Sequence, residues 1–248
     1  MAHVTRITQA VILAGGAGTR LKPLTDHTPK PMILMNGKPF LEYLIKQLKE
    51  NGIEEVLLLL GYLPEKTIAH FGDGAKFGVR IKYSVTPVED SIGTRIRKAA
   101  DLMEDYFILL NCDNFWPLRI EELVKFHNKM NSLITTVVYT NKNGITKNNV
   151  LVDDEGYIVR FDPSRTDPDL NGVNLVYAIT SKEVIGLMPT GDFDYEKVMF
   201  PMLIAQRKLA GYRSDERHHS IGSLERLPGT EQFLKTLDEK NKNESNLS

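Results

Sequence analysis

Residues 10–21 read AVILAGGAGTRL, an apolar run that ends abruptly in three glycines within four positions. Glycine adopts positive φ readily and lets another group approach the backbone closely. Successive exposed N–H groups in such a loop can bind an anion, and Arg20 and Lys30 add two cations to the same region. The segment therefore predicts a polyphosphate site at the end of the first strand. The alternative is a tight turn beside two solvated cations.

Two common phosphate-binding loops are excluded. A Walker loop needs Gly-x-x-x-x-Gly-Lys followed by Ser or Thr, and the sequence contains no such run. The dinucleotide fingerprint needs a third glycine, but Gly16-Ala17-Gly18 is followed by Thr19-Arg20-Leu21. If the loop binds phosphate, it therefore belongs to neither of these two classes.

Apolar, strand-like runs alternate with helical patterns in the first half of the chain. The strand-like runs cover residues 9–13, 56–60, 78–84, 106–110 and 133–139. The helical patterns cover residues 40–50, 94–103 and 118–130. This alternation predicts an α/β fold, with a Rossmann-like, mainly parallel sheet sandwiched by helices.

The second half changes character. A hairpin is expected over residues 149–161, a strand over 174–180, and helices over 195–206 and 224–237. From Asp238 the sequence is polar, and we expect it to fray. With 248 residues and no low-complexity linker, the chain predicts one domain over residues 1–237 and a polar tail over 238–248.

Composition limits the partners. The net charge of −1 argues against binding to nucleic acid or to a membrane by bulk charge. The apolar runs are far too short to span a bilayer. A single cysteine excludes an intrachain disulfide and indicates a reducing, cytoplasmic location.

The pattern GGAGTRL-x-PLT, followed by PKPM at residues 29–32, resembles the sugar-phosphate nucleotidylyltransferases. These enzymes join a nucleoside triphosphate to a sugar 1-phosphate and release pyrophosphate. The resemblance covers residues 10–237 and implies the nucleotide-diphospho-sugar transferase fold, with a mixed sheet. It also implies that residues 1–140 bind nucleotide and residues 141–237 bind sugar.

The chain is similar in length to the short bacterial members of that family. Those members are often dimers, so the resemblance implies a homodimer as one expected assembly. These members include heptose-1-phosphate guanylyltransferases and N-acetylmuramate-1-phosphate uridylyltransferases. The layout favours the guanylyltransferase branch. A uridylyl-, thymidylyl- or cytidylyltransferase, or a catalytically weak homologue that senses nucleotides or nucleotide sugars, remains an alternative.

The resemblance assigns roles on the nucleotide side. Arg20 and Lys30 would neutralise the phosphates. The glycine loop and the segment SIGT at residues 91–94 would bind the nucleotide through Leu13, Ala14, Gly15, Gly16, Gly18, Thr19, Gly93 and Thr94. Arg95 follows where the family usually has small residues. It would lie either on a solvated helix face or in the nucleotide pocket as a third cation.

The segment LNCDNF at residues 110–115 resembles the family's Leu-x-Gly-Asp-x-Phe, whose aspartate binds Mg²⁺. Asp113 is therefore the expected metal ligand and catalytic carboxylate, although it could also cap a turn. Cys112 replaces the glycine and is expected to be a small core-like residue rather than a nucleophile. Ser220 stands where the family has a second aspartate, so we expect one protein carboxylate, Ser220 as a candidate ligand, and substrate phosphates to complete the site.

The sugar side is implied by NGVNLVY at residues 171–177 and YEKVMFP at 195–201, which resemble two further family segments. Asn174 and Glu196 would hydrogen-bond sugar hydroxyls. Val198 stands where an aspartate is usual. Arg165 is the candidate cation for the sugar phosphate.

Overall fold

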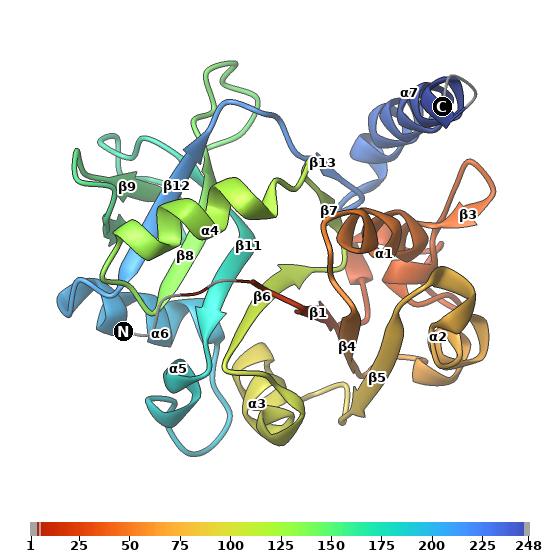
Figure 1. Ribbon diagram of the computed structural model, residues 1–248, viewed down its shortest axis with the longest axis horizontal. Coiled ribbons are helices and arrows are strands. Elements are labelled where there is room, and N and C mark those ends of the chain that lie inside the picture. Colours follow the sequence, from red (N-terminus) through yellow and green to blue (C-terminus); the bar gives the residue numbers. More distant parts are fainter. Residues whose placement is uncertain (1–3, 5, 246–248) are drawn as a thin grey trace.

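The computed structural model describes residue 4 and residues 6–245, the last four of these by their backbone alone. Its centre is a seven-stranded sheet in the order β12-β8-β11-β6-β1-β4-β5 (Figure 1). The strands are β1 Gln9–Ala14, β4 Glu55–Leu60, β5 Arg80–Val85, β6 Tyr106–Asn111, β8 Ile134–Tyr139, β11 Val173–Ser181 and β12 Leu209–Ser214. Only β11 runs against its neighbours, β6 and β8, so the sheet is mixed and mainly parallel, as predicted.

Helices cover both faces of the sheet. They are α1 Phe40–Glu50, α2 Pro64–Phe71, α3 Ile92–Lys98, α4 Ile120–Lys129, α5 Glu183–Gly186, α6 Tyr195–Ala205 and α7 Leu227–Ser245. Successive residues of a strand face opposite sides. In β1, Ile12 belongs to the core under α1 and α4, whereas Val11 belongs to the core under α3 and α6. The predicted helix-sheet-helix sandwich is therefore confirmed.

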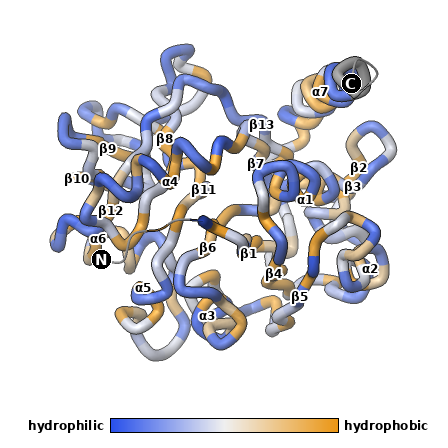
Figure 2. Tube along the Cα trace, in the orientation of Figure 1, coloured by the Kyte–Doolittle hydropathy of each residue, from blue (hydrophilic) through white to orange (hydrophobic). Residues whose placement is uncertain are grey.

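Three short strand pairs stand outside the main sheet. They are β2 Leu34–Met35 with β3 Lys38–Pro39, β7 Asn114–Phe115 with β13 His219–Ser220, and the expected hairpin of β9 Val150–Val152 with β10 Ile158–Phe161. In Figure 2 the sheet strands β4 and β6 are coloured mainly toward the hydrophobic end of the scale. Strands of a parallel sheet are covered on both faces, so their sequences are continuous apolar runs rather than alternating patterns.

Some expected boundaries were wrong. The helix predicted over 94–103 begins at Ile92 and ends at Lys98, and a short 3₁₀ turn follows at Ala100–Leu102. The tail was expected to fray from Asp238, but α7 continues to Ser245, and residues 246–248 lie outside the described residues. Asp238 accepts hydrogen bonds from Lys38 Nζ at 3.1 Å and Tyr43 Oη at 3.4 Å, which anchor the helix to α1 and the hairpin before it.

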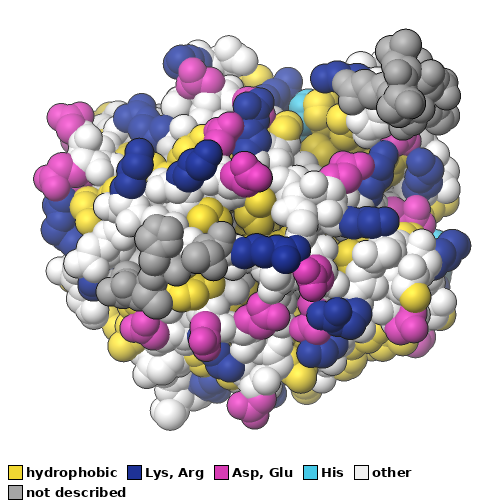
Figure 3. All heavy atoms as spheres, viewed as in Figure 1, with side chains coloured by type: hydrophobic (Ala, Val, Ile, Leu, Met, Phe, Trp, Pro, Cys, Tyr) yellow, Lys and Arg dark blue, Asp and Glu magenta, His cyan; other side chains and the backbone are white. Residues whose placement is uncertain are grey.

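Positive and negative side chains are interspersed over the face drawn in Figure 3. None of the helices in the described part of the chain has the length and apolar character needed to cross a membrane.

Candidate active site

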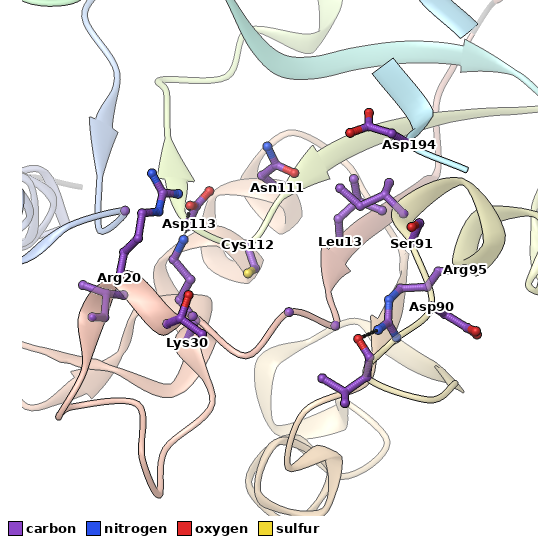
Figure 4. A pocket seen from close by; sticks show the side chains of 18 residues that line it. Leu13, Arg20, Lys30, Asp90, Ser91, Arg95, Asn111, Cys112, Asp113 and Asp194 are labelled. Atoms are coloured by element: carbon purple, nitrogen blue, oxygen red, sulfur yellow. Dashed lines mark hydrogen bonds and ion pairs between the residues drawn. The ribbon is translucent and has the colours of Figure 1, made fainter. Parts of the chain in front are cut away.

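The parallel strands β1, β4, β5 and β6 end at one edge of the sheet, and a cavity of about 490 Å³ lies there. Ligands of open α/β sheets bind at this edge. Figure 4 shows Arg20 and Lys30 at one end of the cavity and Ser91 and Arg95 at the other. The lining residues include Leu13, Gly15, Gly16, Gly18, Thr19, Arg20, Lys30, Asp113 and Arg95. The glycine loop and both predicted phosphate cations thus surround one cavity.

The glycine loop depends on Gly18 for its shape. Gly18 has φ +64°, and a β-carbon there would lie 3.1 Å from Thr25 Cγ2 and 3.3 Å from Lys30 Cβ. Thr25 Oγ1 also donates a hydrogen bond to the Gly18 carbonyl at 3.0 Å. A side chain would therefore be strained and crowded at this position. Gly16 faces open space, and Ala14 is the buried last residue of β1.

Lys30 forms an ion pair with Asp113, and the two side chains are only 13 % and 17 % exposed. The pairing follows from the sheet: Leu13 lies beside Asn111 in the β1–β6 register, so the loops after both strands begin side by side. The residue between Asn111 and Asp113 is Cys112, and burial raises the pKa of its thiol to about 12. A nucleophilic thiolate is not expected there near neutral pH, which agrees with its predicted structural role.

Ser220 lies close to Asp113, as the resemblance implied. Ile221 N donates to the Asp113 carbonyl at 2.9 Å, next to the β7–β13 pair. A β-carbon placed on Gly222 would meet Ser220 Oγ at 3.1 Å and Asp113 Oδ2 at 3.7 Å, so two oxygens converge on one small space. Hard cations bind such oxygens. However, the described residues contain no group of three or more His, Cys, Asp or Glu side chains that could hold a metal.

Gly93 and Thr94 have structural partners outside the glycine loop. A β-carbon on Gly93 would lie 2.4 Å from the Phe193 ring. Thr94 Oγ1 donates to Asp192 Oδ1 at 2.6 Å, and the same carboxylate accepts from Ser91 N at 2.8 Å and Ser91 Oγ at 2.6 Å. These hydrogen bonds hold the pKa of Asp192 at about 2. Asp192 thus caps the start of α3 from a segment about a hundred residues away in the chain.

Arg95 does not lie on a solvated helix face, which was one of its two expected positions. Its side chain lines the cavity and the residue is only 4 % exposed. The terminal nitrogens of its guanidinium are bound to protein oxygens rather than left free as a third phosphate cation.

The predicted sugar-side residues also come together. Asn174 Nδ2 donates to Glu196 Oε1 at 2.5 Å, and Asn174 Oδ1 accepts from Thr136 Oγ1 at 2.7 Å. Asn174 precedes a bulge in β11, where Val176 adopts φ +55° and the register with β8 shifts. Burial raises the pKa of Glu196, with the nearby Asp194 carboxylate as a second cause. Such a carboxyl-amide pair can bind hydroxyl groups.

Arg165 lies beside this pair. Burial lowers its pKa, the Arg226 guanidinium adds to that shift, and the Glu196 carboxylate opposes it. Its Nη1 donates to the Lys147 carbonyl at 2.6 Å. Sequence reasoning missed Arg226, which lines a second cavity of about 170 Å³ together with His218 and Ser220. It also missed Asp192 and Asp194, whose only signal was a polar segment before an expected helix.

Comparison with known protein families matches residues 9–216 to the Nucleotidyl transferase family, and the chain belongs to that family. It is 32 % identical over 227 residues to a mannose-1-phosphate guanylyltransferase of Mycobacterium tuberculosis, covering 89 % of this chain and 63 % of that protein. It is 33 % identical over 155 residues to the D-glycero-alpha-D-manno-heptose 1-phosphate guanylyltransferase of Campylobacter jejuni, covering 62 % and 67 % of the two chains.

A UTP–glucose-1-phosphate uridylyltransferase of Synechocystis sp. is 30 % identical over 213 residues, covering 79 % of this chain and 55 % of that protein. This chain therefore spans less than two thirds of the Mycobacterium and Synechocystis proteins. Two solved structures share its fold. HddC from Yersinia pseudotuberculosis has a TM-score of 0.75, 22 % identity and coverage of 92 % and 100 %. A UDP-glucose pyrophosphorylase complexed with UDP-glucose has a TM-score of 0.78, 15 % identity and coverage of 93 % and 99 %.

Proposed function

We propose that this chain transfers a nucleotidyl group from a nucleoside triphosphate to a sugar 1-phosphate, giving a nucleotide sugar and pyrophosphate. The observation that carries this proposal is the Lys30–Asp113 pair beside the glycine loop, at the end of a cavity that also presents Arg20. Two cations and the backbone of a glycine loop around one cavity suit a triphosphate. The relatives named for guanylyl and uridylyl transfer to sugar 1-phosphates support the same reaction class.

The reaction needs charge neutralisation rather than a strong base. A phosphate monoester has its second pKa near about 6, so the attacking oxygen of the sugar phosphate is ionised at neutral pH. That oxygen forms a bond to the α-phosphorus, and the bond from the α-phosphorus to the bridging oxygen breaks, so pyrophosphate leaves. Arg20 and Lys30 would offset the charge on the phosphates, as cations do in other phosphoryl transfers.

The oxygens of Asp113 and Ser220 fit a Mg²⁺ site that substrate phosphates would complete. A bound Mg²⁺ would polarise phosphate oxygens and neutralise their charge. With Ser220 in place of a carboxylate, we expect weak metal binding before nucleotide arrives. Asn174 and Glu196 would bind sugar hydroxyls, and Arg165 would lie near the sugar phosphate.

Two guanylyltransferases among the relatives favour guanosine triphosphate as donor and a mannose- or heptose-like acceptor. A pyrophosphate-release assay across the common nucleoside triphosphates and a panel of sugar 1-phosphates tests this. Turnover with guanosine triphosphate and such an acceptor is the expected result. Turnover only with another base would keep the reaction class and overturn the guanylyl preference. A cytoplasmic location and a homodimer stay predictions.

A nucleotide or nucleotide-sugar sensor is the second candidate. The observation that favours it is Ser220 in the position of the second carboxylate, with Arg95 and Val198 as further departures from the family pattern. Calorimetry separates the two functions. Nucleotide binding without pyrophosphate release from any donor-acceptor pair would favour the sensor.

A further inference from the structure

The guanidinium of Arg95 is buried at the far end of the cavity from Lys30 (Figure 4). Its Nη1 donates to the Leu60 carbonyl at 2.9 Å and to Thr86 Oγ1 at 2.6 Å. Its Nη2 donates to the Pro87 carbonyl at 2.8 Å and to the Val88 carbonyl at 3.0 Å. Four protein oxygens therefore use all four N–H groups of the two terminal nitrogens.

The same guanidinium packs against two glycines. A β-carbon on Gly15 would lie 2.5 Å from Arg95 Cζ, and a β-carbon on Gly61 would lie 2.5 Å from Arg95 Nη1. Tyr62 N also donates to the Gly15 carbonyl at 3.1 Å, which ties the ends of β1 and β4 together. One side chain thus contacts the glycine loop, the loop after β4 and the loop after β5.

These loops form one wall of the cavity. Gly15, Val88 and Arg95 all line it, and Figure 4 shows Arg95 at the end opposite the phosphate cations. If the triphosphate lies beside Arg20 and Lys30, the nucleoside must extend toward this wall. The terminal nitrogens of Arg95 are already bound to protein oxygens, so they are not free for a bidentate contact with phosphate. Arg95 therefore influences the nucleoside end of the cavity through the backbone that it holds in place.

We propose that Arg95 is a positioning residue that fixes the nucleoside end of the cavity by bracing the Thr86–Val88 segment against Gly15. This inference rests on the proposed function, and it adds that Arg95 governs nucleotide affinity rather than the transfer step. Arg95, which holds these carbonyls, lies at the opposite end of the cavity from Arg20 and Lys30, beside which the reacting phosphates would lie. Binding should therefore change while the chemistry, once substrate is bound, does not.

A lysine at position 95 cannot reproduce these four hydrogen bonds. Its ammonium keeps the charge but is a single nitrogen, whereas the planar guanidinium spans four acceptors on two strand ends. Arg95→Lys and Arg95→Met therefore separate charge from geometry. If geometry matters, both variants lose affinity to a similar extent. If charge alone matters, Arg95→Lys retains it.

The test measures nucleoside triphosphate binding by calorimetry together with kcat and KM for both substrates. We expect Arg95→Lys and Arg95→Met to weaken nucleotide binding by about tenfold or more, the worth of about one lost hydrogen bond to a charged group. We expect kcat at saturating nucleotide and KM for the sugar phosphate to stay close to wild type. Arg97→Lys is the matched control, because Arg97 is in the same helix and does not line the cavity.

A second variant covers the case in which Arg95 substitutions prevent folding. Thr86→Val removes one acceptor of the Arg95 guanidinium and keeps the arginine, so a smaller loss of nucleotide affinity is expected. Unchanged nucleotide affinity in folded Arg95→Met, or in Thr86→Val where the Arg95 variants do not fold, overturns the inference. So does a fall in kcat with nucleotide affinity intact. Absence of triphosphate binding in the wild type would instead overturn the proposed function on which the inference rests.

Discussion

Lys30 and Asp113 are 83 residues apart in sequence, yet their side chains form an ion pair at the edge of the sheet. Each residue follows a different strand, and the parallel pairing of β1 with β6 brings the two loops together. The expected phosphate cation and the expected metal ligand thus neutralise each other in this structure. A metal ion or a phosphate entering the cavity must compete with this pair.

Lys30→Ala should lower turnover by well over tenfold. The change removes a cation that would stabilise charge in the transition state, and such contacts contribute on the order of 2–4 kcal/mol. Pyrophosphate release measures the effect. The thermal midpoint without ligand should fall only modestly, because Asp113 loses its ion-pair partner but lines the cavity. Lys22→Ala is the control, because Lys22 is 62 % exposed and pairs with Asp26. Normal turnover of Lys30→Ala would contradict the phosphate assignment.

Gly18→Val should abolish nucleotide binding while the protein still folds. The branched side chain would need positive φ, at a local cost of about 1 kcal/mol, and would displace Thr25 and Lys30 from their present positions. Calorimetry with a nucleoside triphosphate measures the loss. Gly37→Val is the matched control, because Gly37 has φ +78° in the β2–β3 hairpin, with open space around it. Equal affinity in both variants would remove the glycine loop from the site.

The metal prediction uses two substitutions with opposite effects. Asp113→Asn should eliminate turnover at any Mg²⁺ concentration, because the amide binds a hard cation more weakly than the carboxylate. Ser220→Asp should lower the Mg²⁺ concentration needed for half the maximal rate, because it places a second carboxylate beside Asp113. An active Asp113→Asn variant, together with an unchanged Mg²⁺ requirement in Ser220→Asp, would locate the metal elsewhere.

Glu196 provides a pH-dependent prediction. Burial raises its pKa above the ordinary 4.5, so folding makes Glu196 harder to ionise than it is in the unfolded chain. The protonated Glu196 side chain therefore contributes to the free energy of unfolding below the pKa of the unfolded chain. This contribution is lost as the pH rises through the raised pKa of the folded state. Glu196→Gln removes this titration, so its thermal midpoint relative to wild type should rise as the pH increases above the ordinary pKa of Glu196.

Glu196→Gln should also raise KM for the sugar phosphate, because a neutral amide is a weaker acceptor for hydroxyl groups than a carboxylate. The control is Glu65→Gln, since Glu65 is exposed in the first turn of α2 just as Glu196 lies in the first turn of α6. A midpoint difference that does not vary with pH would mean that Glu196 is ionised in the fold as readily as in the unfolded chain.

The sequence predicted the elements whose burial is visible in the local pattern of apolar residues. Buried strands such as β4 read as unbroken apolar runs, and Asp113 could be placed because it follows such a run. The strand β12 was missed because LAGYRS at residues 209–214 combines a glycine with polar residues. Helix α2 was missed because its PEKTIAHF sequence buries little, with Thr67 and Phe71 the only buried residues among those described.

The unpredicted parts of the site are contacts made across the fold. The sequence alone could not decide whether Arg95 is exposed or buried, because its hydrogen-bond acceptors come from the segments at the ends of β4 and β5. Arg226 and Arg165 approach each other from separate segments, so neither sequence position signals the other. Side-chain pairs of this kind depend on tertiary packing, which no local pattern encodes.

The cap that Asp192 places on α3 joins two regions with different tasks. The segment that carries Asp192 leads into α6 and Glu196, while Ser91 and Thr94, which donate hydrogen bonds to Asp192, belong to the segment proposed to bind nucleotide. A ligand that orders one of these segments therefore lowers the conformational entropy that the other segment loses when its own ligand binds. Thermodynamic linkage makes that benefit reciprocal, so each substrate's apparent affinity would depend on the concentration of the other even where the two molecules do not touch.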